Sequence, residues 1–409
     1  MISFKKFITE DKNTHMEHIE DNILNAGVKG TRDAINFIRA LRTMLSGSSK
    51  SKVNVTVKWD GAPAVFAGID PSDGKFFVAK KGIFNKNPKV YKTNADVDAD
   101  TKGDLNTKLK LALAELPKLG ITGVVQGDFL YAKEDLKMVD FDGEPHVTFH
   151  PNTIVYAVPA ASKLGKEILG SKIGVVWHTT YRGSSFEEMS ASFGEEIASG
   201  LKTIKSVWSV DAIYKDVSGS ANMTAAETAK VTKLVSNIGK KFNTIKATTL
   251  NGISDNEETL MRTKTFINSK IRVGEPIRNP KSFVKDLVKY IDDYYENEAA
   301  KRKTDKGKTA QRAKKGSTLD YFNRTPESQL VAMFELYNMM IEVKHVLIAK
   351  LDKAKKVGTF LRTKDGYQVT GSEGFVAIDH MGKNAVKLVD RLGFSNANFS
   401  DKYIKGWQK

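Results

Sequence analysis

The feature that most constrains the fold is a long helical stretch between two strand-rich segments. From about residue 53 to 181 the chain carries short alternating or apolar runs that are typical of strands. Residues 186–350 change to long amphipathic segments of helical period. Strand character returns from residue 366 onward. A strand-rich domain interrupted by a helical insertion accounts for this order.

This order predicts the limits of four parts of the chain. Near the N-terminus, Ile35, Ile38 and Leu41 recur at helical spacing, and Thr31 followed by Asp33 predicts a helix start. The predicted parts are an N-terminal helical segment (1–50), the first part of the strand-rich core (51–185), a helical basic insertion (186–355), and the second part of the core with a C-terminal tail (356–409).

Charge and composition limit the class of protein. Lys and Arg outnumber Asp and Glu by 64 to 48, and the net charge of +16 favours polyanionic partners. The absence of cysteine excludes disulfides and thiolate chemistry. The first fifteen residues lack the apolar region of a secretory signal, and no apolar run approaches the ~20 residues that cross a bilayer. We therefore expect a soluble cytoplasmic protein with no membrane partner.

The basic residues are concentrated in one segment. Residues 301–315 hold eight basic residues and one acidic residue, and their Gly, Thr and Gln content predicts a mobile loop between helices. Such a run is usually solvated, and the functional alternative is contact with a nucleic-acid backbone. The candidates for that contact are Lys301, Arg302, Lys303, Arg312, Lys314 and Lys315.

Lys58-Trp59-Asp60-Gly61 is the sharpest local motif. It follows the alternating valines of residues 53–57, so a lysine ends a predicted strand and a turn follows. A lysine held there can act as a nucleophile if neighbouring positive charge and desolvation lower its pKa. The alternative is a hairpin turn with a solvated lysine. His15 and His18 lie further upstream, where an amphipathic helix face is expected and phosphate contact is the alternative.

Further motifs follow in a characteristic order. They are Ala79-Lys80-Lys81-Gly82, residues 124–130 with Asp128, Glu373-Gly374-Phe375-Val376 and residues 385–389 with Lys387. Together with the Lys58 motif, this set resembles the covalent nucleotidyltransferases: ATP-dependent DNA ligases, RNA ligases and mRNA capping enzymes. The resemblance covers residues 53–180 and 366–391 but not the helical stretch. The motif order is also similar to that of uncharacterised phage-encoded ligase-like proteins.

The resemblance implies a fold of the α+β class. Its core would be the nucleotidyltransferase, or ATP-grasp-like ligase, arrangement of antiparallel sheets, interrupted by the largely helical insertion. Only eighteen residues follow Arg391, too few for the OB-fold that DNA ligases and capping enzymes carry. We therefore expect no C-terminal OB-fold.

The resemblance also implies a chemistry. Lys58 would attack the α-phosphate of ATP and retain AMP as a phosphoramidate, while Lys387 neutralises developing charge. Glu373 and Asp128 would hold Mg²⁺ or Mn²⁺, because carboxylates suit hard cations. The implied nucleotide-binding residues are Asp60, Lys81, Asp128 and Lys387, with Tyr156 or Trp177 stacking on adenine. Taken singly, Glu373 also fits an exposed turn acid and Lys387 an edge-strand lysine.

Several positions depart from the family pattern. DNA ligases usually have an arginine shortly after the first motif, where this chain has Ala62-Pro63-Ala64. The third motif usually carries Glu, and Asp128 is favoured there over Asp142-Gly143-Glu144, which has the pattern of a hairpin turn. Val389 stands where the last motif often has a second lysine.

The function implied is an ATP-dependent polynucleotide ligase that seals 5′-phosphate to 3′-hydroxyl ends. The expected absence of an OB-fold favours RNA ends over DNA nicks. Two alternatives are a GTP-dependent capping guanylyltransferase and a catalytically inactive accessory protein that binds nucleic acid. The partner is RNA or DNA in each case, and a monomer is the simplest expectation.

Overall fold

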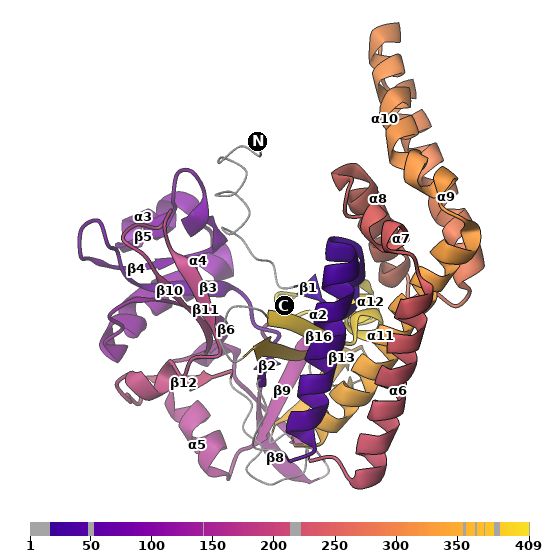
Figure 1. Cartoon of the computed structure of the whole chain (residues 1–409). Helices are drawn as coiled ribbons and strands as arrows, with labels where there is room; N and C mark the ends of the chain where they lie inside the picture. Colours follow the sequence, from indigo (N-terminus) through magenta and orange to yellow (C-terminus); the bar gives the residue numbers. More distant parts are fainter. Residues whose placement is uncertain are drawn as a thin grey trace.

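The protein has a mixed α+β fold, which confirms the predicted class. In the computed structural model, three mainly antiparallel sheets lie beside a body of helices (Figure 1). We call them sheets A, B and C. The structure describes residues 17–47, 53–141, 143–212, 222–354, 357–364, 366–371, 373–379 and 385–408.

Sheet B has seven strands, all of which lie between residues 64 and 211. Helices α3 (Asn94–Asp100) and α4 (Gly103–Glu115) lie against one face, where Leu109 and Ala112 pack into the apolar core of the sheet. The opposite face carries Asp128. The strands are β3 (Ala64–Ile69), β4 (Phe76–Ala79), β5 (Val90–Tyr91), β6 (Val124–Ala132), β10 (Ile173–Arg182), β11 (Ser190–Phe193) and β12 (Val207–Asp211).

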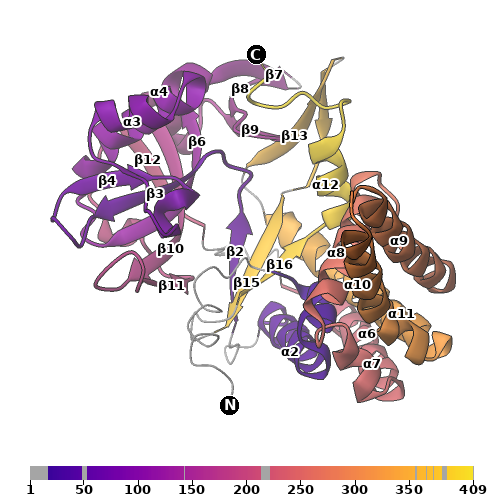
Figure 2. The ribbon, with the colours of Figure 1, turned by 90° about the horizontal axis from the view of Figure 1, so that it is seen from above.

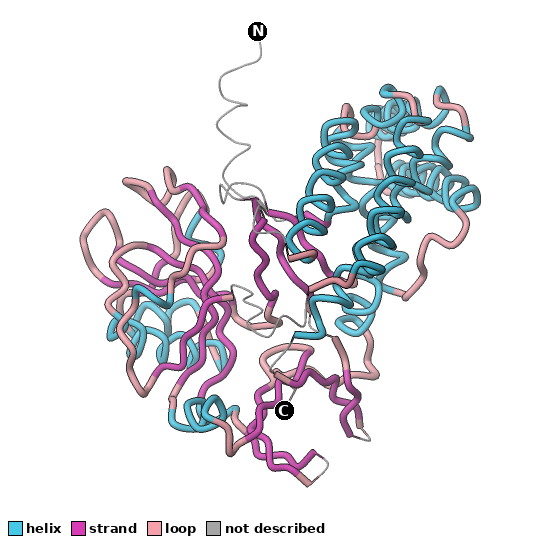
Figure 3. Tube along the Cα trace, turned by 60° about the horizontal axis from the view of Figure 1, so that its bottom comes forward, coloured by secondary structure: helices cyan, strands magenta, loops and turns pink. Residues whose placement is uncertain are grey.

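Sheet C has five strands in the order β14-β13-β9-β8-β7 and lies at the bottom of Figure 3. The rings of Phe141 on β7 and Phe360 on β13 stack with their centroids 4.4 Å apart, although two other strands lie between β7 and β13 in the sheet. Neighbouring strands are about 4.8 Å apart, so a flat sheet would hold these rings apart; the sheet must curl. The strands are β7 (Lys137–Phe141), β8 (Glu144–Phe149), β9 (Ile154–Pro159), β13 (Gly358–Thr363) and β14 (Gly366–Val369), with α5 (Lys163–Gly170) beside β8 and β9.

Sheet A joins three segments that are far apart in the sequence. Its order is β1-β16-β15-β2, in which only β1 and β16 are parallel neighbours. Seen from above, it lies between sheet B and the helical body (Figure 2). The strands are β1 (Glu17–His18), β2 (Val53–Lys58), β15 (Gly374–Asp379) and β16 (Ala385–Val389).

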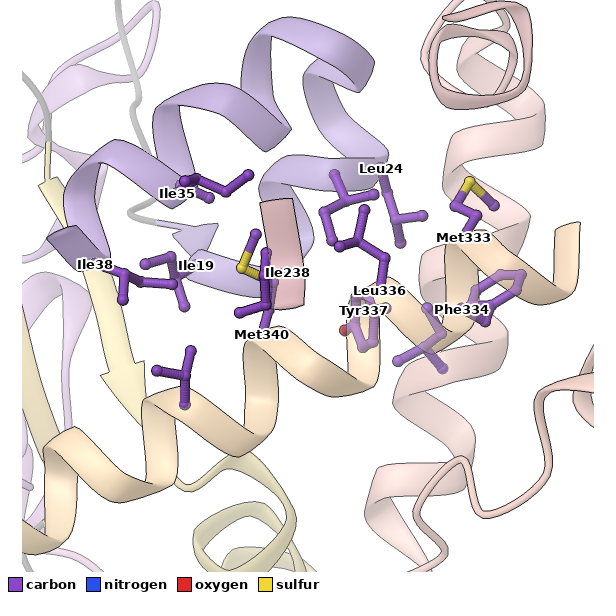
Figure 4. Packing of buried hydrophobic residues seen from close by; sticks show 14 of the residues in the cluster. Ile19, Leu24, Ile35, Ile38, Ile238, Met333, Phe334, Leu336, Tyr337 and Met340 are labelled. Carbon is purple, nitrogen blue, oxygen red and sulfur yellow. The ribbon is translucent and has the colours of Figure 1, made fainter. Parts of the chain in front are cut away.

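The helical body packs against one face of sheet A. Phe375 and Leu388 from the sheet join a single apolar cluster with residues of α2 and α6–α11, part of which Figure 4 shows. The N-terminal helix therefore belongs to this body. The helices are α2 (Asn22–Leu45), α6 (Ala225–Thr244), α7 (Ala247–Gly252), α8 (Glu257–Arg272), α9 (Pro280–Ala300), α10 (Asp305–Arg324) and α11 (Glu327–Leu351); α12 (Arg391–Phe399) packs on α8.

Two predicted helix boundaries are wrong. Helix α2 begins at Asn22, before the predicted start at Thr31, and kinks at Gly27, whose φ is +49°. The kink is held by Asn251, whose side chain accepts a hydrogen bond from the Val28 amide, a contact that local sequence does not reveal. The helical stretch begins at Ala225 rather than at residue 186, because residues 190–193 and 207–211 form strands of sheet B.

The predicted mobile loop at residues 301–315 is also wrong. Only a short turn follows α9, and α10 begins at Asp305. Thr304 caps this helix by accepting a hydrogen bond from the Gly307 amide, which supports a helix start within a sequence rich in Gly and Thr. Figure 1 shows α10 extending beyond the other helices.

Across the described ranges, none of the helices combines the length and apolarity that crossing a bilayer requires.

The fold contains a fully buried ion pair that offers a test of the packing between α11 and the 3₁₀ helix η1 (Ile19–Asp21). Lys344 Nζ lies 2.7 Å from Glu20 Oε1, and both side chains are 1% exposed. Replacing Lys344 by Met leaves the Glu20 charge buried without a partner, so unfolding free energy should fall by about 3–5 kcal/mol. Urea denaturation measures this loss.

The matched control is the exposed pair between Lys29 and Asp33. Lys29→Ala should change the unfolding free energy by less than about 1 kcal/mol, because water already solvates both charges. The double variant with Glu20→Leu and Lys344→Met should be more stable than Lys344→Met alone. Equal losses from Lys344→Met and Lys29→Ala would contradict this account.

Candidate active site

Lys58 ends strand β2 on the face of sheet A that the helical body leaves uncovered. Val55 packs into the helical core, and side chains alternate along a strand, so Lys58 points the opposite way. Its Nζ forms an ion pair with Glu373 Oε1. Glu373 directly precedes Gly374, which pairs with Lys58 across β2 and β15. Strand pairing therefore joins the predicted nucleophile to a carboxylate 315 residues away.

Lys387 lies on the same face of sheet A. It pairs with Val376 across β15 and β16, and Val376 is two residues beyond the partner of Lys58. Directly paired residues share a face, and so do residues two apart. Burial, followed by the charge of Lys58, lowers the pKa of Lys387. The two lysines of the first and last motifs therefore lie close enough to influence each other.

Asp128 lies near Lys58 but belongs to strand β6 of sheet B. The turn after Lys58 runs beside β6, where the Ala62 amide donates to the Phe129 carbonyl. A Cβ on Gly61 would lie 2.4 Å from the Cβ of Asp128, so this approach requires glycine. His178 on β10 faces the same carboxylate, with 3.9 Å between its Nε2 and Asp128 Oδ2.

The alternative acid for the third motif lies elsewhere. Glu144 is exposed on β8 of sheet C, and Asp142 is outside the described residues.

The charges around Lys58 differ from the expectation that positive neighbours lower its pKa. Burial opposes its charged form, but Glu373, Asp128 and Asp60 outweigh burial, and the pKa of Lys58 is raised. That expectation is wrong because the dominant neighbours are carboxylates. Burial raises the pKa of Glu373 to about 7 and also raises the pKa of Asp128.

Asp60 is a structural anchor, which corrects its assignment to nucleotide binding. It is 3% exposed and accepts hydrogen bonds from the side chain of Asn152 and the amides of Thr153 and Ile154. Its own amide donates to the Tyr156 hydroxyl at 2.7 Å. With its oxygens occupied, Asp60 fixes the turn after Lys58 to the start of β9.

Neither predicted adenine-stacking residue presents a free ring face. Trp177 is fully buried in the core of sheet B, and its Nε1 donates to Ser209. Tyr156 is 4% exposed and packs between Trp59 and Phe149. Both assignments are corrected, because these aromatic residues belong to apolar cores.

Another aromatic group lies on the Asp128 face of sheet B. The Tyr181 hydroxyl donates to Gln126, two residues before Asp128, and the ring packs 4.9 Å from Phe84. Both rings are half-buried. Phe84 ends the short 3₁₀ helix η2 (Lys81–Phe84), which Lys81 begins. The exposed Lys81 acts electrostatically on both Asp128 and Lys387, so it faces the cluster.

The carboxylates near Lys58 suit a divalent ion that arrives with a nucleotide. Within the described segments, no three His, Cys, Asp or Glu side chains gather as a metal site. Glu373 and Asp128 remain as two carboxylates near Lys58. Mg²⁺ commonly takes one or two carboxylates together with substrate phosphates, so these two residues fit such an ion.

The six nucleic-acid candidates lie on the turn before α10 and on its first eleven residues, away from Lys58. Lys301 and Arg302 pair with Glu298 of α9, while Arg312 and Lys315 pair with Glu296. Lys303 and Lys314 are exposed, and no ion pair is recorded for them within the described residues. These two lysines are therefore the most available to an external anion.

Two histidines lie at this site: His178, which the sequence analysis did not consider, and His18, for which it gave phosphate contact only as the alternative. His178 interrupts an apolar strand, a signal that could have indicated a functional residue. His18 lies on β1 beside Lys387 rather than on the expected amphipathic helix. Its position depends on pairing with a strand about 370 residues away, which local sequence cannot reveal.

Comparison with known proteins identifies a family without assigning an activity. No curated protein and no solved structure matches the chain. A family model, described as a family of unknown function (DUF6267), matches residues 13–403. This match spans both strand-rich segments and the helical body. The chain therefore belongs to the DUF6267 family.

Proposed function

We propose that this protein is an ATP-dependent polynucleotide ligase that forms a covalent adenylate on Lys58, within a nucleotidyltransferase-like core. The observation that carries the proposal is the convergence of Lys58, Lys387 and Asp128 from three strands of two sheets with Glu373, which directly precedes β15. These residues come from the motifs that resemble the nucleotidyltransferases. If these motifs matched the family only by chance, there would be no reason for their residues, which are far apart in the sequence, to lie together in the structure.

The proposed reaction begins with proton loss from Lys58. The Nζ lone pair then forms a bond to the α-phosphorus of ATP, and the bond from that phosphorus to the bridging oxygen breaks. Pyrophosphate leaves with the electron pair. Glu373 contacts Lys58 and can accept its proton, because burial raises the pKa of Glu373 to about 7.

The neighbouring residues then stabilise charge and position the nucleotide. Lys387 lies where it can neutralise charge on the α-phosphate. Asp128 and the Glu373 oxygen that does not contact Lys58 would hold Mg²⁺, which would supply charge neutralisation at the phosphates. Tyr181 and Phe84 replace the buried aromatic residues as candidates for contact with the base. In two later steps, AMP passes to a 5′-phosphate, and a 3′-hydroxyl displaces it to seal the strand.

The substrate proposal favours RNA ends. The basic α10, which extends from the helical body, offers the nucleic-acid contact.

The covalent step gives the most direct test. Incubation with Mg²⁺ and ATP labelled at the α-phosphorus should leave label on the protein through a denaturing gel. Lys58→Ala should abolish the label, because the bond forms on its Nζ. Lys110→Ala is the matched control, since Lys110 of α4 pairs with Asp98 of α3 on the face of sheet B opposite Asp128 and should leave labelling unchanged.

Other outcomes of this assay separate the alternatives. Label transferred only from GTP would favour a capping guanylyltransferase. No label from either nucleotide would contradict both enzymes and favour an accessory nucleic-acid-binding protein. Incubating the labelled protein with 5′-phosphorylated RNA or nicked DNA then identifies the strand that accepts AMP.

A second prediction concerns the charge of Lys58. Glu373→Gln removes the carboxylate that most strongly raises the pKa of Lys58, so that pKa should fall. Reductive ¹³C-methylation followed by an NMR titration measures it, with Lys58→Arg identifying the signal. The same variant should adenylylate poorly because Glu373 also serves the reaction.

The control for this titration is Asp100→Asn, which removes a surface carboxylate paired with Lys80 and Lys89. It should leave the Lys58 titration unchanged. An unchanged or higher Lys58 midpoint in Glu373→Gln would contradict the assigned pairing.

A third prediction concerns α10. Replacing Lys303 and Lys314 with Ala should weaken binding of single-stranded RNA and reduce the magnitude of its salt slope by roughly 1.4, about 0.7 for each lost phosphate contact. Fluorescence anisotropy over a range of salt concentrations measures this slope. Lys163→Ala with Lys166→Ala removes the same charge from α5 and serves as the control. Equal slopes for the two double variants would exclude α10 from the binding surface.

A further inference from the structure

His18 stands at the edge of sheet A beside Lys387. Strand β1 pairs in parallel with β16, and the register places His18 opposite Lys387. Lys387 in turn lies opposite Val376, two residues beyond the partner of Lys58. Since paired residues share a face, His18, Lys387 and Lys58 all lie on the face turned away from the helical core.

The His18 ring has a hydrogen-bonding atom without a protein partner. Its Nδ1 is buried, and no group in the described structure bonds to it. A buried polar atom left in this state is costly, so a missing partner is expected. The charges that act on the ring belong to Lys344, Arg391, Lys387 and Lys58. A neutral imidazole N–H among four cations is suited to an anionic acceptor.

A buried network fixes the backbone beside this ring. The residues after His18 form η1 (Ile19–Asp21), in which Glu20 pairs with Lys344 of α11. Asp21 pairs with Arg391 at 3.1 Å and accepts a hydrogen bond from the Tyr337 hydroxyl at 2.7 Å. These contacts tie β1 to α11 and α12. The ring is therefore presented by a rigid element, as a preorganised binding group requires.

The direction of the proposed reaction indicates which anion would reach His18. In-line attack places the leaving group on the far side of the α-phosphorus from Lys58 Nζ. Three strand spacings, about 14 Å, separate β2 from β1, with Lys387 between them. A lysine side chain and a triphosphate together can span this distance. The β- and γ-phosphates would then extend across sheet A from Lys58, past Lys387, towards His18.

We propose that His18 and Lys387 form the subsite that binds the pyrophosphate leaving group of ATP. This inference rests on the proposed ligase function. His18 would donate its Nδ1–H to a pyrophosphate oxygen and keep that proton throughout. Pyrophosphate is present in the first step and absent from the transfer of AMP and from sealing. His18 should therefore matter for adenylylation and for its reversal alone.

The test separates adenylylation from sealing. His18→Ala should slow labelling from ATP by about 10- to 100-fold, as expected for a lost hydrogen bond to a charged group. The same protein should seal an RNA whose 5′ end already carries AMP within about twofold of the wild-type rate. The KM for pyrophosphate in reversal of the adenylate should rise. His18→Asn, whose amide can replace the Nδ1 donor, should recover part of the labelling rate.

Controls distinguish the subsite from a structural role. His146→Ala, on β8 of sheet C, should leave both reactions unchanged. Equal slowing of labelling and sealing by His18→Ala and His18→Asn would mean that His18 only supports the fold and would overturn the subsite. Unchanged labelling in His18→Ala would overturn it as well. A wild-type protein that takes no label would instead overturn the ligase proposal itself.

Discussion

The ion pair between Lys58 and Glu373 is the interaction on which the arrangement of the site depends. It joins the end of β2 to the start of β15, with sheets B and C and almost the whole helical body between them in the sequence. Both side chains are largely buried, so either charge alone would be costly. The pair is therefore stable only when β2 and β15 are in register, and that register also places Lys387.

The helical body packs against the face of sheet A opposite Lys58 and stabilises this register. Its apolar cluster takes residues from β2, β15 and β16, and the buried pairs of Glu20 and Asp21 attach β1 to α11 and α12. The four strands of sheet A are therefore held against one surface. The helical body contributes none of the four residues Lys58, Glu373, Lys387 and Asp128. By packing against sheet A, however, it determines the positions of the two lysines. A role limited to binding nucleic acid would not explain why the helical core includes residues of sheet A.

The parts predicted from sequence were those that depend on local pattern. Alternating apolar residues revealed β2 with Lys58 at its end, and the resemblance to the nucleotidyltransferases pointed to Asp128, Glu373 and Lys387; the structure brings these residues together. Wrong predictions arose where distant contacts decide. Asn251 holds the kink of α2, the curled sheet C buries Tyr156, and β16 converts the segment around His18 into a strand. None of these contacts has a signature in the segment it changes.

The raised pKa of Lys58 connects this geometry with the order of events in the proposed reaction. Without nucleotide, Glu373 and Asp128 favour the protonated amine, which cannot attack phosphorus. Lys58 loses this stabilisation when the two carboxylates share their oxygens with a divalent ion or when Glu373 takes the proton. Under the proposed function, Lys387 and His18 would then supply the positive and donor groups that a triphosphate needs. The ion pair would thus keep Lys58 protonated until the proposed nucleotide is bound.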